Sequence, residues 1–344
     1  MPSGAASAVP DEEMALLAPS LGDCYRVVGA RDLGGAPVEL AVRGGRFVED
    51  AGCEQSLDAE GQVIVPALID AHVHLAYLPR EAALLRNGIA GAVDLGSPMS
   101  FLAHETSPLR LRRAGPMVTA LGGYPTQSWG AGGYGLECAD GPGCLAAADR
   151  LLDAGAALVK IPIGHAPELD DATLTTLVDH VHERGAVVVV HALSDRAVQR
   201  AASAGADVLA HTPTEALSES SVRAWSGRAV ISTLGAFGGT PTTIENLRRL
   251  RAGGARVFYG TDFGNTRTAG IDARELGLLE EAGLDTAAIL AAATLEPASF
   301  FGFPHLGALE AGRAASFLLV DVSAVEDPTA LARPSLVVID GAPQ

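Results

Sequence analysis

Two histidines separated by one residue, His72 and His74, are the clearest sign of chemistry in this sequence. They end the apolar run 63–74, which is rich in β-branched residues and typical of a strand. Side chains two positions apart on a strand point to the same face, so both imidazoles would reach one small volume. Because imidazole nitrogens are common ligands of divalent cations, the spacing predicts a metal site at the end of this strand.

Four further residues of ligand type each end a later apolar run: Lys160, His191, His211 and Asp262. Any one of these side chains alone could be an ordinary core or surface residue. Taken with the histidine pair, they make six candidate ligands at strand ends, and this coincidence favours one shared metal site.

The elements that would position these residues lie between residues 67 and 302, where apolar strands alternate with amphipathic helices. One predicted helix has apolar residues at helical spacing over 174–181 and stops at Gly185, which can adopt the left-handed cap conformation. The pattern predicts an α/β fold, a (β/α)8 TIM-type barrel over 67–302, with its active site at the carboxyl ends of the strands. The eight predicted strands end near His74, Asp94, Leu121, Lys160, His191, His211, Thr233 and Asp262.

The two ends of the chain have a different pattern, with short β-like pieces broken by glycine pairs. We expect residues 23–66 and 303–344 to pair with each other and form one small β-sandwich domain beside the barrel. Residues 1–22 are rich in Ala, Ser and Pro and lack periodicity, which predicts a flexible N-terminal arm.

Composition restricts the possible partners. The chain has 344 residues, 48% of them hydrophobic, and 24 Lys and Arg against 41 Asp and Glu give a net charge of −17. This charge disfavours nucleic acid and anionic membranes as partners, and a small-molecule substrate is expected. No apolar stretch has the length of a membrane helix, and the first basic residue is Arg26, so a basic signal-peptide start is missing. These features predict a cytoplasmic protein, with a homo-oligomer left open.

The four cysteines, at positions 24, 53, 138 and 144, contain no CxxC pair. Their spacing therefore disfavours a structural zinc knuckle and favours free thiols in a reducing compartment. A bridge between Cys138 and Cys144 within one loop stays open at this point.

The residues that carry a family resemblance are the segment Asp70–His74, Lys160, His191, His211 and the segment Gly260–Asp262. With them, the chain resembles the amidohydrolase superfamily. The segments Leu306–Gly312 and Ala315–Asp321 are similar to the closing β segment of imidazolonepropionase-like and prolidase-like members, which are metal-dependent hydrolases. Two positions depart from the usual pattern, Ala67 before the histidine pair and Ala210 before His211, but neither removes a ligand.

The resemblance implies a binuclear centre of two divalent metal ions, with Zn²⁺ expected and Mn, Co or Fe able to use the same ligands. His72, His74 and Asp262 would hold one ion, and His191 and His211 the other. Lys160 would bridge them as a carbamate formed with carbon dioxide. A metal-bridged hydroxide would then attack the substrate carbonyl, with Asp262 as the general base that becomes the general acid.

Three functional hypotheses follow. The first is a hydrolase of a C–N amide-type bond in a linear or cyclic amide or a short peptide. The second is an ester or lactone hydrolase on the same centre, because the sequence does not reveal the leaving atom. The third is a catalytically silent binding protein, which the complete ligand set disfavours. Ser194 occupies the place where deaminase-like members carry a glutamate, so a deaminase is also disfavoured.

Candidate substrate contacts lie in segments that follow the predicted strands. The long loop 122–143 is of the kind that is usually functional or disordered. Polar and aromatic residues at these places could meet a substrate, and Arg267 would suit a carboxylate. The candidates are Tyr124, Trp129, Tyr134, His165, Thr233, Asn265 and Arg267.

Overall fold

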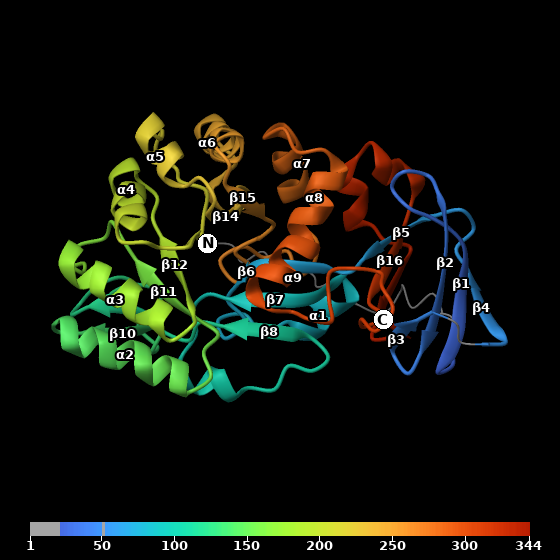
Figure 1. Cartoon of the computed structure of the whole chain (residues 1–344), viewed down its shortest axis with the longest axis horizontal. Coiled ribbons are helices and arrows are strands. Elements are labelled where there is room, and N and C mark those ends of the chain that lie inside the picture. Colours follow the sequence, from blue (N-terminus) through green and yellow to red (C-terminus); the bar gives the residue numbers. More distant parts are fainter. Residues whose placement is uncertain (1–20, 50–51) are drawn as a thin grey trace, which may run out of the picture.

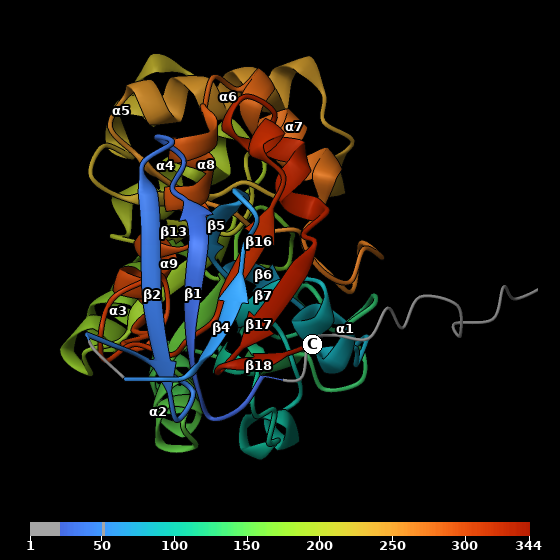
Figure 2. The same ribbon diagram turned by 90° about the vertical axis from the view of Figure 1, so that its right-hand side faces the viewer.

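The computed structural model describes residues 21–49 and 52–344, so most of the predicted N-terminal arm lies outside the described residues. Strands from the two chain ends join in one eight-stranded sheet of order β18-β17-β16-β5-β1-β2-β3, with β4 beside β1 (Figure 2). The antiparallel pairing of β5 with β16 confirms that the two chain ends pair. The strands are β1 (Cys24–Arg31), β2 (Pro37–Arg43), β3 (Arg46–Val48), β4 (Gln55–Asp58), β5 (Val63–Pro66), β16 (Phe317–Val320), β17 (Leu336–Ile339) and β18 (Ala342–Pro343).

The central part of the chain contains parallel strands, as the alternating pattern predicts. A strand is present at each of the eight predicted places, and β8 and β10 are additional. β6 is hydrogen-bonded to β7 and also to the segment after β15, where the Ala71 amide donates to the Tyr259 carbonyl at 2.9 Å. The first and last central strands are therefore neighbours. These strands are β6 (Leu68–Val73), β7 (Ile89–Asp94), β8 (Arg110–Arg113), β9 (Met117–Ala120), β10 (Gly135–Cys138), β11 (Leu158–Pro162), β12 (Val187–His191), β13 (Val208–Leu209), β14 (Ala229–Ile231) and β15 (Arg256–Phe258).

Helices α2 to α6 lie along the outer side of strands β10 to β15 (Figure 1). Among the described residues, no helix combines the length and apolar character needed to cross a membrane. The helices are α1 (Glu81–Arg86), α2 (Gly141–Asp153), α3 (Asp171–Glu183), α4 (Asp195–Ser203), α5 (Glu219–Ala224), α6 (Pro241–Ala252), α7 (Ala273–Glu281), α8 (Thr286–Ala293) and α9 (Leu295–Phe301), with 3₁₀ turns η1 (Met99–Ala103), η2 (Gly235–Phe237), η3 (Val322–Val325) and η4 (Pro328–Ala332).

Helix α3 shows how the sequence sets these elements. The carboxylate of Asp170 accepts a hydrogen bond from the amide of Thr173 at 2.9 Å and caps the first turn. The helix buries all four of the apolar residues that the periodicity predicts, Leu174, Leu177, Val178 and Val181. Gly185 follows it with a φ of 74°, the left-handed conformation expected at this position.

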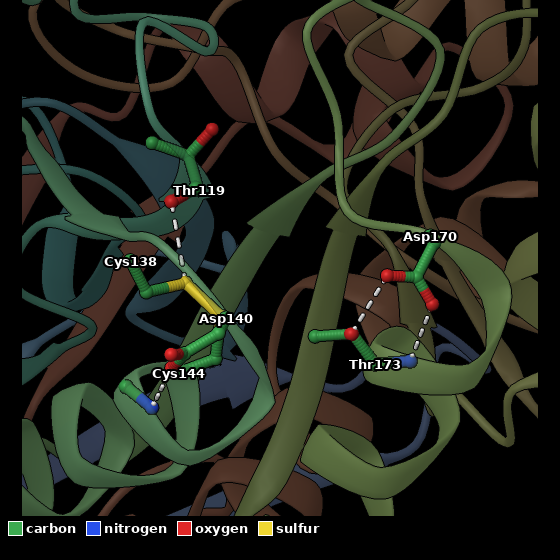
Figure 3. Close-up of a disulfide and its surroundings, with 7 residues drawn as sticks. Thr119, Cys138, Asp140, Cys144, Asp170 and Thr173 are labelled. Atoms are coloured by element: carbon green, nitrogen blue, oxygen red, sulfur yellow. Dashed lines mark hydrogen bonds between the residues drawn. A yellow bond between two sulfur atoms is a disulfide. The ribbon is translucent and has the colours of Figure 1, made fainter.

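The expectation of free thiols is wrong, because all four cysteines are paired. Cys138 at the end of β10 is bonded to Cys144 in α2 (Figure 3), and Cys24 in β1 is bonded to Cys53. β4 runs parallel to β1, and this pairing brings Cys53 to Cys24 across 29 residues of sequence, a proximity that the spacing alone does not reveal. Disulfides are typical of oxidising compartments, so the cysteines do not support the expected cytoplasmic location.

The predicted long loop 122–143 is shorter than expected, since β10 and the start of α2 occupy its second half. β10 pairs in parallel with β9, and Asp140 accepts a hydrogen bond from the Gly143 amide at 2.8 Å to begin α2. The remaining segment, residues 121–134, carries Tyr124 and Trp129 toward the carboxyl ends of the strands.

Candidate metal centre

A cavity of about 360 Å³ brings together side chains from the carboxyl ends of several central strands. All six predicted metal ligands line it, together with four of the seven predicted substrate contacts. The lining residues are His72, His74, Met117, Tyr124, Trp129, Lys160, His165, His191, Leu193, His211, Ala236, Phe237, Asp262 and Asn265.

Three ligand atoms form a small triangle at the base of this cavity. The Nε2 atoms of His72 and His74 lie 3.2 Å apart, and Oδ1 of Asp262 is 3.5 Å from the first and 3.2 Å from the second. Ligands about 2.0–2.1 Å from a tetrahedral Zn²⁺ lie about 3.3 Å from one another. The triangle therefore has the size that a shared cation needs, and His211 offers a further nitrogen within 4.8 Å of the His72 and Asp262 donors.

The outer nitrogens of three histidines contact fixed acceptors, and this orients their inner nitrogens. Nδ1 of His72 lies 2.9 Å from the Ala210 carbonyl, and Nδ1 of His74 lies 3.1 Å from the Gly96 carbonyl. A carbonyl oxygen only accepts, so both rings carry a proton on Nδ1 and direct Nε2 toward the other ligand atoms. Nδ1 of His211 similarly lies 3.2 Å from the hydroxyl of Thr233.

The protonation of these rings suits metal binding. Burial lowers the pKa of His191 to about 3, and burial also lowers the pKa values of His72 and His211. Burial acts in the same direction on His74, but the neighbouring Asp262 carboxylate reverses the effect and raises its pKa. Three of the four rings are therefore neutral at pH 7, the form in which imidazole binds a metal.

Lys160 is the only lysine in the chain, and it is fully buried. Its Nζ atom has no hydrogen-bond partner among the described residues. The Lys160 ammonium forms no ion pair with the buried Asp94, whose carboxylate accepts a hydrogen bond from the Leu75 amide at 2.8 Å. Burial lowers the pKa of Lys160 to about 7, so much of the amine is neutral and able to react with carbon dioxide.

Asp262 has an unusual backbone conformation, with a φ of 55°. Its carbonyl accepts hydrogen bonds from the amides of Asn265 and Thr266, and Asn265 Nδ2 donates to Oδ1 at 3.0 Å. Burial alone would raise the pKa of Asp262, but His72, His74 and the Asn265 donor lower it to about 2. The carboxylate is therefore ionised and held in one orientation at neutral pH.

Aromatic rings surround the histidines on the cavity side. The Trp129 ring meets that of His74 edge to face at 5.2 Å, and the Phe237 ring meets that of His211 in the same way at 4.9 Å. Tyr124 stacks on His191 at 5.1 Å, and its hydroxyl accepts a hydrogen bond from Trp129 Nε1 at 2.7 Å. These rings form an apolar wall next to the ligand atoms.

The structure does not place Tyr134, Thr233 or Arg267 among the side chains that line the cavity. The ring centroids of Tyr134 and Trp129 lie 5.3 Å apart. The Thr233 hydroxyl lies 3.2 Å from Nδ1 of His211, and Arg267 is exposed. Substrate contact by these three residues stays a prediction.

Sequence reasoning also missed cavity residues. The missed side chains are apolar. Three of them lie in segments that follow strands and one begins β9, and at these positions the pattern gives no signal for a pocket. They are Met117, Leu193, Ala236 and Phe237.

Comparison with known proteins connects this site to a family. Residues 63–343 match the model of the Amidohydrolase family. No curated protein matches the sequence. Among solved structures, a Xaa-Pro dipeptidase with bound methionine aligns with a TM-score of 0.79 at 18% identity, covering 93% of this chain and 99% of that one.

Two further solved structures have the same fold. Phenylurea hydrolase B aligns with a TM-score of 0.75 at 18% identity, covering 93% of this chain and 96% of that chain. Molinate hydrolase aligns with a TM-score of 0.73 at 18% identity, covering 94% and 95%. The family match spans most of the sequence and includes every candidate ligand. The chain therefore belongs to the amidohydrolase family and is a hydrolase that acts on carbon–nitrogen bonds.

Proposed function

We propose that this protein is a metal-dependent hydrolase that cleaves an amide-type bond, linear or cyclic, in a small molecule or short peptide. The observation that carries the proposal is the triangle of His72 Nε2, His74 Nε2 and Asp262 Oδ1, with sides of 3.2–3.5 Å, at the base of a cavity. A cavity of about 360 Å³ is within the size range of small-molecule sites.

The donors around this triangle fit two divalent cations, and a histidine-rich set with one carboxylate suits zinc. His72, His74 and Asp262 would hold one ion, and His191 and His211 the second. Lys160 would bridge them as a carbamate, and this would give its unpartnered Nζ a role in the site. Bound cations of this kind lower the pKa of a water molecule and polarise the substrate carbonyl.

Asp262 is the proposed general base and acid. Its ionised carboxylate can take a proton from the attacking water and return it to the leaving nitrogen as the bond breaks. Asn265 holds Oδ1 of that carboxylate through a hydrogen bond of 3.0 Å, so the proton acceptor keeps a fixed direction.

The relatives support carbon–nitrogen cleavage. One similar structure is named a Xaa-Pro dipeptidase and another a phenylurea hydrolase. A peptide and a urea both join nitrogen to a carbonyl carbon, and we propose that the scissile bond in the substrate of this chain is of that type.

We also propose the domain boundaries. Residues 67–302 would form a closed (β/α)8 barrel, and residues 23–66 with 303–344 would form the small β-sandwich beside it. The hydrogen bonds between β6 and the segment after β15 support closure, since His74 donates its amide to the Phe263 carbonyl at 2.7 Å.

The test combines metal content and turnover. Protein produced with zinc and bicarbonate should contain about two ions per chain by plasma mass spectrometry, and it should hydrolyse amides from a panel of anilides, cyclic amides and dipeptides. We expect Asp262→Asn to lose at least 100-fold in kcat, while Asp153→Asn, at an exposed site, changes little. Hydrolysis of lactones without their matched lactams would favour the ester alternative, and metal-loaded protein inactive on every substrate would contradict the proposal.

A further inference from the structure

The part of the cavity beyond the ligand atoms is mainly apolar. Six of its side chains are aromatic or aliphatic, and two are polar, His165 and Asn265. Asn265 already donates to Asp262, and the ring of His165 stacks on Tyr124 at 4.8 Å. The six apolar or aromatic side chains are Met117, Tyr124, Trp129, Leu193, Ala236 and Phe237.

The aromatic rings lie directly against the ligand histidines, at centroid distances of 4.9–5.2 Å. They come from two segments: Tyr124 and Trp129 follow β9, and Phe237 belongs to η2 after β14. A group attached to either side of the scissile bond must therefore pass close to an aromatic face or edge. Planar and branched apolar groups gain from such contacts, through burial and through offset or edge-on ring packing.

The cavity offers little to a negatively charged group. Among the described residues, its lining contains no arginine, and the one lysine there is fully buried and belongs to the ligand set. Arg267, which the sequence offered as a partner for a carboxylate, is exposed and does not line the cavity. A carboxylate placed against the aromatic wall would lose water without gaining an arginine or lysine partner there, and the net charge of −17 would also repel it on approach.

We propose that the cavity selects uncharged substrates that carry an aromatic ring or a branched apolar group next to the scissile bond, and that it rejects those with a free carboxylate there. This inference rests on the proposed function and narrows its substrate class. Neutral N-aryl and N-alkyl amides, ureas and carbamates fit it, whereas dipeptides with a free carboxyl end do not.

A matched pair of metal-chelating probes tests the selectivity without requiring turnover. Benzohydroxamic acids bearing a para-carboxamide or a para-carboxylate are nearly equal in shape and differ in charge. Titration calorimetry on zinc-loaded protein at pH 8 should give a dissociation constant at least 10-fold lower for the carboxamide. Equal or tighter binding of the carboxylate would overturn the inference, and so would failure of both probes to bind at millimolar concentration.

Leu193 provides a gain-of-function test, because it is half-buried in the cavity wall outside the ligand set. Leu193→Arg should reduce the carboxamide-to-carboxylate ratio at least 5-fold by supplying the missing cation, whereas Leu193→Gln should leave that ratio unchanged. If L193Q lowers the ratio as much as L193R does, charge does not cause the selectivity and the inference is overturned. If zinc-loaded protein shows this selectivity yet hydrolyses no amide, the proposed function fails and the selectivity stands.

Discussion

The hydroxyl of Thr261 donates a hydrogen bond of 2.5 Å to Oδ2 of the buried Asp70. The other oxygen of Asp70 accepts from the amide of Thr261 at 3.1 Å and from the amide of His72 at 3.0 Å. One carboxylate thus joins the strand that carries the histidine pair to the residue that precedes Asp262. Asp70 does not itself line the cavity, but its hydrogen bonds hold the residues next to the ligand atoms of the triangle.

Loss of this junction should weaken both the fold and the metal site. Asp70→Ala leaves two buried amides without acceptors, and we expect it to lower the free energy of unfolding by about 2–4 kcal/mol. Metal affinity should fall about 10–100-fold, as for other groups that orient ligands. Asp70→Asn keeps one oxygen for both amides and should retain most of the stability. Urea unfolding and zinc titration measure both effects, and an alanine variant with normal zinc affinity would contradict the positioning role.

Replacement of Lys160 should raise the stability of the metal-free protein and lower its metal content. Lys160→Met replaces a buried, unpartnered amine by an apolar side chain of similar length, so the metal-free protein should gain about 1–3 kcal/mol. The same variant should lose at least one of the two expected ions, because it cannot form a carbamate. Since the chain has no other lysine, the lysine carbamate signal from ¹³C-bicarbonate in the NMR spectrum should vanish in K160M. A signal that persists there would contradict carbamate formation at Lys160.

Glu275 in α7 should make stability depend on pH. Its carboxylate is buried and accepts from the amides of Leu234 and Gly235 at 2.9 and 2.7 Å. Burial raises its pKa from 4.5 to about 7, so between these values the folded protein binds more protons than the unfolded chain. The protonated Glu275 therefore contributes fully to the free energy of unfolding below pH 4.5. This contribution decreases by about 3 kcal/mol as the pH rises to 7.

The Glu275→Gln variant cannot titrate at this position and isolates the effect. The difference in unfolding free energy between wild type and E275Q should fall by about 2–3 kcal/mol from pH 5 to pH 8. Glu280→Gln, at an exposed site on the same helix, should show no such change. If the difference in unfolding free energy between wild type and E275Q is constant over this pH range, the pKa of Glu275 is not raised.

The two disulfides should contribute unequally to stability. By loop-closure entropy, the Cys24–Cys53 bond, which spans 29 residues, is worth about 4 kcal/mol, and the Cys138–Cys144 bond, which spans 6, about 2 kcal/mol. Paired Cys→Ala replacements, compared by urea unfolding under oxidising conditions, should show the larger loss for the first pair. Thiol titration of the unfolded wild-type protein should find none free, and four reactive thiols would contradict the pairing.

Much of the fold follows from sequence, because strands and helices leave a periodic pattern of apolar residues. The eight central strands and the four buried positions of α3 lie where that pattern places them. β8 and β10, which are additional to the eight predicted strands, are only four residues long and contain no apolar run, as in the sequence Arg110–Arg113. Their pairing depends on neighbouring strands, which a local pattern does not contain.

The candidate ligands could be found because each ends an apolar run, and barrel geometry brings strand ends together. The cavity wall could not be predicted in the same way. Phe237 belongs to a short 3₁₀ turn and reaches His211 only through the path of the backbone after β14. Asp70 lies within the recognised motif, but its bond to Thr261 joins residues 191 positions apart, and no spacing rule predicts that contact.

Thr233 offers a test of how the second metal position is oriented. Its hydroxyl lies 3.2 Å from Nδ1 of His211, and its φ of 40° is unusual for a β-branched residue. Such strain persists only where the surrounding structure enforces it. Thr233→Val keeps the shape and the backbone preference but removes the acceptor for the His211 ring, so affinity for the second zinc ion should fall about 10–100-fold.

Thr233→Ser is the matched control, because it keeps the hydroxyl and removes only the methyl group. We expect T233S to bind the second ion about as tightly as wild type and T233V to retain only the first ion under limiting zinc. Competition with a chelator of known affinity separates the two binding steps. If T233S loses the second ion as fully as T233V, the hydroxyl alone does not position His211, and if neither variant loses it, the Thr233 hydroxyl plays no part in orienting the ring.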